Sequence, residues 1–301
     1  MPPDAAVPYD EMGLFHENAA EFGLPYDGPP TVARLAVEVA PGRRLSALRW
    51  GEGPPELVFL HGGAQNAHTW DTVALALGRP LLAIDLPGHG HSDGPAEGST
   101  DTASNARDVA SAIEQLAPQA QGLIGMSLGG LTALAVTDAR PDLVRSLVLV
   151  DITPGVDEQK ASAIVAFVDG PESFPDFDEL LARTKQFNPT RSEASLRRGI
   201  LHNALQRSDG SWVWRYRRFL DRSGPMDSSA LWEAVDRIQA PVLLVRGMRP
   251  QSVVDDADEA ELLRRLPTAQ VARVEEAGHS VQGDDPLELA RLIDEFVPAP
   301  T

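Results

Sequence analysis

The chain has 301 residues, of which 43% are hydrophobic and 23% are charged. These fractions are ordinary for a soluble globular protein, and the length suits one α/β domain of about 200 to 250 residues that carries an insertion. The formal net charge of −18 disfavours nucleic acid and anionic lipid as partners, because the field of the protein repels phosphates. No apolar run approaches the ~18 residues that a membrane span requires.

The chain contains no cysteine, which excludes disulfides, cysteine-ligated metals and thiol catalysis. Its first residues are acidic and lack the basic and apolar segments of a secretory signal, so we expect a cytoplasmic location. Residues 1–30 are rich in proline and acidic side chains. They predict an amino-terminal arm, or a short helix that lies on the surface.

Apolar runs and helical patterns then alternate along the chain. Strands are predicted at residues 32–39, 45–50, 57–60, 81–84, 123–126, 147–150, 242–245 and 271–274. Helices are predicted at residues 68–77, 103–116, 131–139, 256–266 and 286–296. Most strands from the third onward are short and wholly apolar, as strands buried on both faces are. The alternation predicts an α/β fold with a mostly parallel eight-stranded sheet flanked by helices.

Residues 155–237 interrupt this alternation. They carry helical patterns at 177–184 and 193–205, and four aromatic side chains near their end: Trp212, Trp214, Tyr216 and Phe219. We interpret the segment as a mainly helical cap, inserted between the two parts of the core domain at residues 31–154 and 238–301.

A candidate nucleophile lies in the pentapeptide Gly125-Met126-Ser127-Leu128-Gly129, between a predicted strand and a predicted helix. Strand and helix pass so close at such a turn that a Cβ at either glycine would collide, and the serine holds strained dihedrals. Ser127 Oγ would therefore be exposed. Ser92 sits in the same pattern, but a glycine turn precedes it instead of a strand, and Gly94-Pro95 follows it instead of a helix. We therefore reject Ser92 as the nucleophile.

A serine nucleophile needs a base. His279 lies in a loop just past the last predicted strand, and so emerges at the same sheet edge as the serine. The pair His89-x-His91 offers two metal ligands, but no third ligand stands at a suitable spacing, and we interpret both as structural turn residues. His16 and His68 have no catalytic context, and His202 is compatible with the core, the surface or a substrate contact.

Two carboxylates compete for the role of orienting acid. Asp151 closes the predicted strand at 147–150, which gives the order Ser, Asp, His along the chain. Asp255 is the alternative acid, but the acidic residues after it are typical of a helix N-cap and first turn. We favour Asp151. Asp85 also ends a strand, but it precedes the serine and a glycine turn, and we assign it to loop bracing.

Hydrolysis of an acyl group also needs hydrogen-bond donors for the oxyanion. The backbone N–H of Leu128, directly after the serine, is one candidate. The other is the N–H of Gly63, in the turn His61-Gly62-Gly63-Ala64 after the third strand. Gln65 and Asn66 follow this turn, and they either line a pocket or cap and pack the next helix.

Together His61-Gly62-Gly63, residues 85–92, Gly125 to Gly130 and Gly278-His279-Ser280 resemble the motifs of the α/β-hydrolase superfamily, in the same order. The resemblance extends to residues 65–70 and 212–216. Over nearly its whole length after the amino-terminal arm, the chain resembles a mycobacterial ester hydrolase of this fold. The resemblance implies a Ser/Asp/His hydrolase of small esters. Many members carry the acid after the seventh strand, but residues 248–252 contain no carboxylate, which supports Asp151.

The motifs also narrow the reaction. A serine at position 127 differs from the aspartate of haloalkane dehalogenases and epoxide hydrolases, and Met126 stands where carbon–carbon bond hydrolases commonly have asparagine. The prediction is a carboxylesterase without metal or cofactor, whose small ester substrate contacts Gln65, Asn66, Met126, Trp214 or His202. Alternatives are a non-catalytic ligand-binding relative, and a thioesterase, acyltransferase or carbon–carbon bond hydrolase. Both a monomer and a homodimer remain open.

Overall fold

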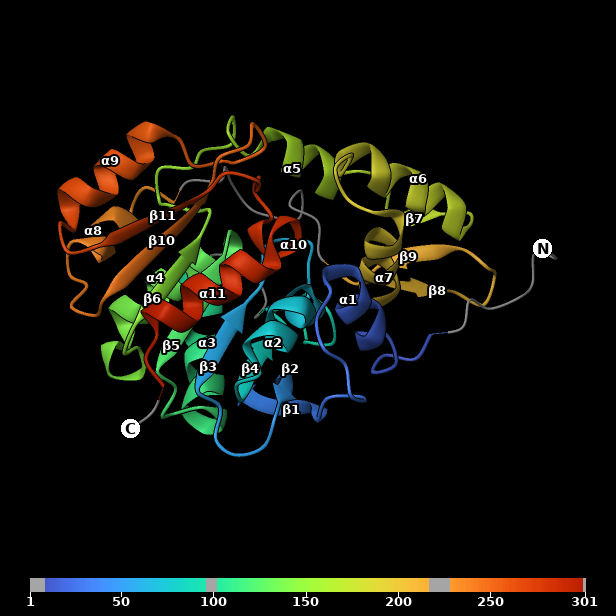
Figure 1. Ribbon diagram of the computed structural model, residues 1–301, viewed down its shortest axis with the longest axis horizontal. Helices are drawn as coiled ribbons and strands as arrows, with labels where there is room; N and C mark the ends of the chain where they lie inside the picture. Colours follow the sequence, from blue (N-terminus) through green and yellow to red (C-terminus); the bar gives the residue numbers. More distant parts are fainter. Residues whose placement is uncertain (1–8, 96–101, 217–227, 300–301) are drawn as a thin grey trace.

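The computed structural model describes residues 9–95, 102–216 and 228–299 (Figure 1). Its centre is an eight-stranded sheet with the order β1-β2-β4-β3-β5-β6-β10-β11. The strands are β1 Val32–Ala40, β2 Arg43–Trp50, β3 Leu57–Leu60, β4 Leu81–Ile84, β5 Gly122–Met126, β6 Leu147–Val150, β10 Val242–Gly247 and β11 Gln270–Val274. Strand β2 is antiparallel to both neighbours, and the other neighbouring pairs are parallel. All eight predicted strands are confirmed.

Successive side chains of the central strands enter two separate hydrophobic cores. In β3, Val58 and Leu60 contribute to one core, and Leu57 and Phe59 contribute to the other. All four are at most 1% exposed. Because strand side chains alternate between faces, an unbroken apolar run is required where both faces are covered, as the sequence pattern predicted.

Helices cover both faces of the sheet (Figure 1). Side chains of α3 Thr102–Leu116, α4 Leu128–Ala139, α8 Leu231–Val235 and α9 Asp256–Arg265 enter one core. Side chains of α1 Phe15–Phe22, α2 Asp71–Leu77, α10 Val281–Asp284 and α11 Pro286–Phe296 enter the other. Two short 3₁₀ helices, η1 Ala67–Trp70 and η2 Pro141–Leu143, complete the core. The five predicted core helices are present.

Residues 162–214 form a smaller layer beside the carboxyl ends of the parallel strands (Figure 1). It contains α5 Ser162–Val168, α6 Phe177–Phe187, α7 Glu193–Asn203, β7 Ser173–Phe174, β8 Ala204–Gln206 and β9 Trp212–Trp214. The three strands form their own sheet in the order β7-β9-β8. This sheet was not predicted, because its strands have only two or three residues and the helical pattern of α7 runs into β8. Phe219, one of the four aromatic residues assigned to the cap from the sequence, lies outside the described residues.

This layer has a small core of its own, which includes Leu180, Leu201 and Trp212. Helix α8 differs, although it also lies within the range predicted as cap. Its Trp232 and Val235 are buried in the main core, against helix α4. The chain therefore returns to the core before residue 238.

The amino-terminal segment packs more deeply than a surface arm would. Helix α1 corresponds to the short helix that was the alternative to an arm, but its Phe15 is only 1% exposed. The Phe15 ring lies 4.8 Å from the Trp50 ring, centroid to centroid. In Figure 1 this helix lies between the sheet domain and the cap layer. Among the helices of the described residues, none is both long and apolar enough to cross a membrane.

Candidate active site

Ser127 occupies the sharp turn between β5 and α4. Its φ of 50° and ψ of −120° lie outside the regions that side chains usually allow. A Cβ on Gly125 would approach the Gly129 carbonyl oxygen to 2.4 Å, and one on Gly129 would approach the Leu60 carbonyl oxygen to 2.3 Å. Both glycines are therefore required by backbone contact, as predicted. The serine is partly exposed although the strand before it is buried.

The second serine of this pattern has a different environment. The Ser92 hydroxyl donates to the Asp85 carbonyl oxygen at 2.5 Å and accepts from the Ser46 N–H at 2.8 Å. The Asp85 carboxylate accepts from the N–H groups of Ala67 and His91, at 2.7 and 3.1 Å. These bonds agree with the prediction that Asp85 braces the loops at this edge of the sheet.

Asp151 contacts His279 at the carboxyl ends of β6 and β11. The Asp151 Oδ2 accepts from His279 Nδ1 at 2.9 Å. The carboxylate is fully buried and accepts three further hydrogen bonds: Oδ1 from Gly247 N and Ser252 Oγ at 2.9 and 2.6 Å, and Oδ2 from Val253 N at 3.0 Å. Four donors around one carboxylate fix its orientation.

Asp255 has the structural environment that its helical context indicated. Its side chain accepts from Asp258 N at 2.9 Å and begins helix α9 in a capping box. It also forms an ion pair of 2.8 Å with Lys160. The hydrogen bond from Lys160 and the capped N–H lower the pKa of Asp255 to about 2. Among the described residues, no contact joins it to His279.

The loop after β3 lies beside Ser127. An added Cβ on Gly62 would be 3.3 Å from both Ser127 Cβ and Gln65 Oε1, so Gln65 lies close to the predicted nucleophile. Gln65 Oε1 accepts from Gly62 N at 3.1 Å. Within the described residues, the N–H groups of Gly63 and Leu128 donate no hydrogen bond to the protein. Two unpaired donors thus flank the turn that carries the serine.

Two other histidines near this edge are structural. His61 Nε2 accepts from Leu86 N at 2.9 Å, and His89 Nδ1 lies 3.1 Å from the Pro87 carbonyl oxygen. Burial lowers the pKa of His61, and burial together with the neighbouring His61 lowers the pKa of His89 to about 3. Both rings are neutral near pH 7, and for His89 this agrees with the interpretation as a turn residue.

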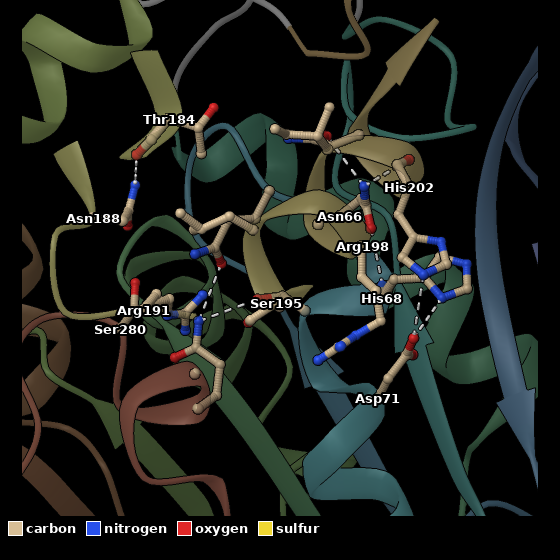
Figure 2. A pocket seen from close by; sticks show the side chains of 18 of the residues that line it. Asn66, His68, Asp71, Thr184, Asn188, Arg191, Ser195, Arg198, His202 and Ser280 are labelled. Atoms are coloured by element: carbon tan, nitrogen blue, oxygen red, sulfur yellow. Dashed lines mark hydrogen bonds and ion pairs between the residues drawn. The ribbon is translucent and has the colours of Figure 1, made fainter. Parts of the chain in front are cut away.

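A cavity of about 180 Å³ lies between helix α1, the start of α2 and the cap helices α6 and α7. Figure 2 shows core and cap side chains facing each other across it. Four of the predicted substrate contacts line the cavity: Gln65, Asn66, His202 and Trp214. The fifth, Met126, does not, because its side chain is buried against Gly62.

Ser127 is also absent from the wall of this cavity. The cavity instead reaches Gln65, close to the serine, and Ser280, next to His279. It therefore adjoins the contact between Asp151 and His279 without including it.

Asn66 and His202 join the core to the cap. The Asn66 side chain begins η1 by accepting from His68 N, and it donates to the His202 carbonyl oxygen at 3.1 Å. The Asn203 side chain donates to the Ala64 carbonyl oxygen at 2.6 Å. Sequence patterns could not predict these bonds, because they join residues about 140 positions apart. The hydrogen bonds from Ser252 and Val253 to the Asp151 carboxylate were not predicted for the same reason.

Comparison with known proteins places this geometry in a family. Residues 57–292 match the model of the alpha/beta hydrolase family. The esterase Rv0045c of Mycobacterium tuberculosis is 44% identical over 96% of this chain and 96% of its own length. A solved structure of that esterase, reported with its transition metal inhibition, has a TM-score of 0.85 at 43% identity and covers 96% of this chain and 99% of that chain. The sn-1-specific diacylglycerol lipase ABHD11 of Mus musculus is 29% identical over 81% of each chain. On this evidence the chain belongs to the alpha/beta hydrolase family.

Proposed function

We propose that the chain is a serine esterase that cleaves small carboxylic esters through an acyl-enzyme intermediate. Ser127 Oγ attacks the ester carbonyl carbon, while His279 Nε2 takes the hydroxyl proton and returns it to the departing alcohol. Water then attacks the acyl-enzyme with the same base. The observation that carries the proposal is the 2.9 Å bond between Asp151 Oδ2 and His279 Nδ1. A carboxylate acceptor keeps the proton on Nδ1 and leaves Nε2 free to act as the base.

The N–H groups of Gly63 and Leu128 are proposed as the oxyanion hole. Each is free of a protein acceptor in the described residues, and such donors contribute on the order of 10²- to 10³-fold in rate apiece. Because Gln65 occupies the N–H of Gly62, the next N–H in the loop is the one available to a substrate. The positive end of helix α4 adds to the field at Leu128.

Small esters are proposed as substrates for two reasons. The relative at 44% identity is named an esterase, and the cavity beside the serine measures only about 180 Å³. Residues 155–237, apart from helix α8, would act as the cap over this site, on a core formed by residues 31–154 and 238–301 together with α8. Trp214 and His202 would then contact the substrate from the cap, and Gln65 and Asn66 from the core.

Hydrolysis of p-nitrophenyl esters from acetate to octanoate tests the proposal directly. The wild type should show saturable activity with an optimum at short chains, and Ser127→Ala should lower kcat by roughly 10⁴- to 10⁶-fold. Equal turnover by the wild type and Ser127→Ala would refute the assignment of the nucleophile.

A fluorophosphonate probe separates an esterase from a ligand-binding relative, because only an activated serine reacts with it. The wild type and Ser92→Ala should label, whereas Ser127→Ala and His279→Ala should not. Ser92→Ala is the matched control, because this serine stands in the same pentapeptide pattern. Parallel assays on thioesters of the same acyl chains test the thioesterase alternative.

A further inference from the structure

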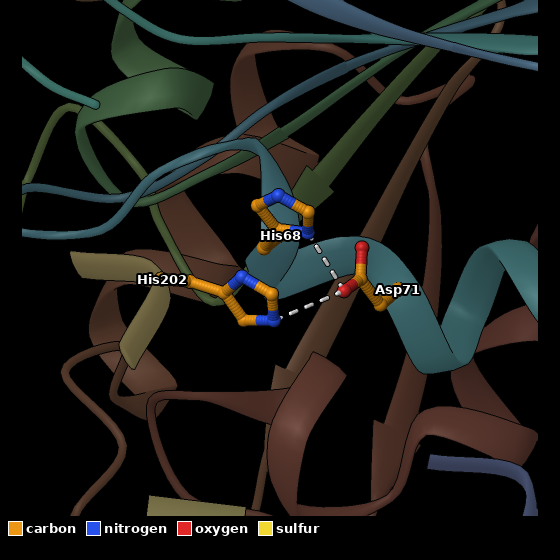
Figure 3. A group of neighbouring side chains, drawn as sticks. All are labelled: His68, Asp71 and His202. Carbon is orange, nitrogen blue, oxygen red and sulfur yellow. Dashed lines mark hydrogen bonds and ion pairs between the residues drawn. The ribbon is translucent and has the colours of Figure 1, made fainter. Parts of the chain in front are cut away.

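Three side chains that can each bind a metal ion meet between core and cap. His68 comes from η1, Asp71 from the start of α2 and His202 from the end of α7. Figure 3 shows both imidazoles directed at one carboxylate oxygen. Asp71 Oδ2 lies 2.9 Å from His68 Nδ1 and 3.8 Å from His202 Nε2. One nitrogen or oxygen atom from each residue lies within 4.8 Å of the others.

This cluster is incompletely satisfied in the structure. Asp71 is 1% exposed, and its second oxygen, Oδ1, is buried with no hydrogen-bond partner among the described residues. A buried carboxylate oxygen without a donor or cation is costly and calls for a specific explanation. The proposed triad and oxyanion hole use none of these three residues, and of the three only His202 is also a proposed substrate contact.

We propose that His68, Asp71 and His202 bind one divalent transition-metal ion of the Zn²⁺ type, which joins the core to the cap. Two imidazole nitrogens and one carboxylate oxygen are a common ligand set for zinc. Tetrahedral zinc at its usual bond lengths separates neighbouring ligand atoms by about 3.3 Å. The two separations from Asp71 Oδ2, 2.9 and 3.8 Å, lie on either side of this value.

The outer nitrogens of both histidines have oxygen partners, as in established zinc sites. His202 Nδ1 lies 2.8 Å from the hydroxyl of Tyr9, and His68 Nε2 lies 3.2 Å from Glu11 Oε1. These contacts leave the inner nitrogens directed at Asp71. Arg34, at 3.5 Å from His68 Nε2, is itself paired with Glu11, so its positive charge is offset.

Access and a free coordination position are also present. All three residues line the cavity between core and cap, so an ion can enter and a water molecule can supply the fourth ligand. The two rings are stacked, with centroids 3.7 Å apart and planes 12° from parallel. Lone pairs of parallel rings do not converge on one point, so binding requires one ring to tilt. A bound ion would thereby couple the position of α7 to that of η1.

Calorimetric titration of Zn²⁺ into the full chain, first freed of metal with EDTA, tests the proposal without reference to activity. The wild type should bind one equivalent, and a 100-fold excess over Kd should raise Tm by about 5 °C. His202→Ala should weaken binding by at least about 100-fold, and Tyr9→Phe, which removes only the outer partner, by about 10-fold. His16→Ala is the matched control, because His16 is an exposed imidazole outside the cluster.

A second ligand variant, Asp71→Asn, keeps the test decisive if His202→Ala folds poorly. Asp71→Asn preserves the size of the side chain and removes only the anionic ligand, and circular dichroism reports whether each variant is folded. Failure of the wild type to bind Zn²⁺ below about 1 mM would overturn the proposal. Equal affinity of the wild type, His202→Ala and Asp71→Asn would also overturn it, as would loss of binding in His16→Ala alone.

Discussion

Replacement of Asp151 by asparagine isolates the carboxylate while it preserves the shape of the side chain. The native carboxylate accepts four hydrogen bonds, from Gly247 N, Ser252 Oγ, Val253 N and His279 Nδ1. An amide has one accepting oxygen and one donating NH₂ group. In either orientation the NH₂ group therefore faces a backbone N–H that needs an acceptor.

The two orientations differ in their effect on His279. If the NH₂ group replaces Oδ2, it donates to His279 Nδ1, which places the ring proton on Nε2 and removes the base. If it replaces Oδ1, Gly247 N loses its acceptor but His279 keeps its tautomer. We expect kcat to fall by about 10⁴-fold, or about 5.5 kcal/mol of transition-state stabilisation. The unsatisfied buried N–H should cost about 1 to 3 kcal/mol of folding stability.

Measurement of kcat and KM on a short p-nitrophenyl ester, together with thermal unfolding, checks both figures. The stability loss should lower Tm by roughly 2 to 10 °C, so the variant should remain folded at 25 °C. Asp255→Asn is the matched control, and its kcat should stay close to that of the wild type. Wild-type turnover in Asp151→Asn combined with loss of turnover in Asp255→Asn would refute the reasoning.

Four further substitutions test the contacts that stabilise the fold. Gly129→Ala should destabilise the fold by about 3 kcal/mol or more, because its Cβ would lie 2.3 Å from a backbone oxygen at the end of β3. Gly199 in α7 has open space around it. Gly199→Ala should therefore stabilise the fold by about 0.5 to 1 kcal/mol, as measured by urea unfolding. Asp255→Asn should lower stability near pH 7 by less than about 1 kcal/mol, because the side chain is 52% exposed and its ion pair with Lys160 is screened. Since its pKa falls from 3.8 to about 2 on folding, this difference should be present above pH 4 and vanish as the pH falls to 2; persistence of the difference at pH 2 would contradict the cause given. Asn66→Ala removes the cap of η1 and a bond to a buried carbonyl oxygen of α7, so it should cost about 2 to 3 kcal/mol; an unchanged urea midpoint would contradict its role in joining core and cap.

Local patterns in the sequence were enough to predict the sheet and the turn that carries Ser127. The strands could be predicted because runs such as Leu147 to Val150 are apolar without interruption where both faces of the sheet are covered. The turn could be predicted because Gly125 and Gly129 are required by backbone contacts within a few residues or with the adjacent strand. The order of the motifs was sufficient for the family, which the comparisons then showed.

The contacts between side chains far apart in the chain could be found only from the folded arrangement of the elements. It joined Asp151 to Ser252 and to His279, 101 and 128 positions further along the chain, and it brought His202 of the cap over His68 and Asp71 of the core. It also formed the cap sheet, whose strands of two or three residues are too short to leave a period in the sequence. Periodicity reports which face of one element is buried, whereas these contacts depend on how separate elements pack, and no local pattern specifies that.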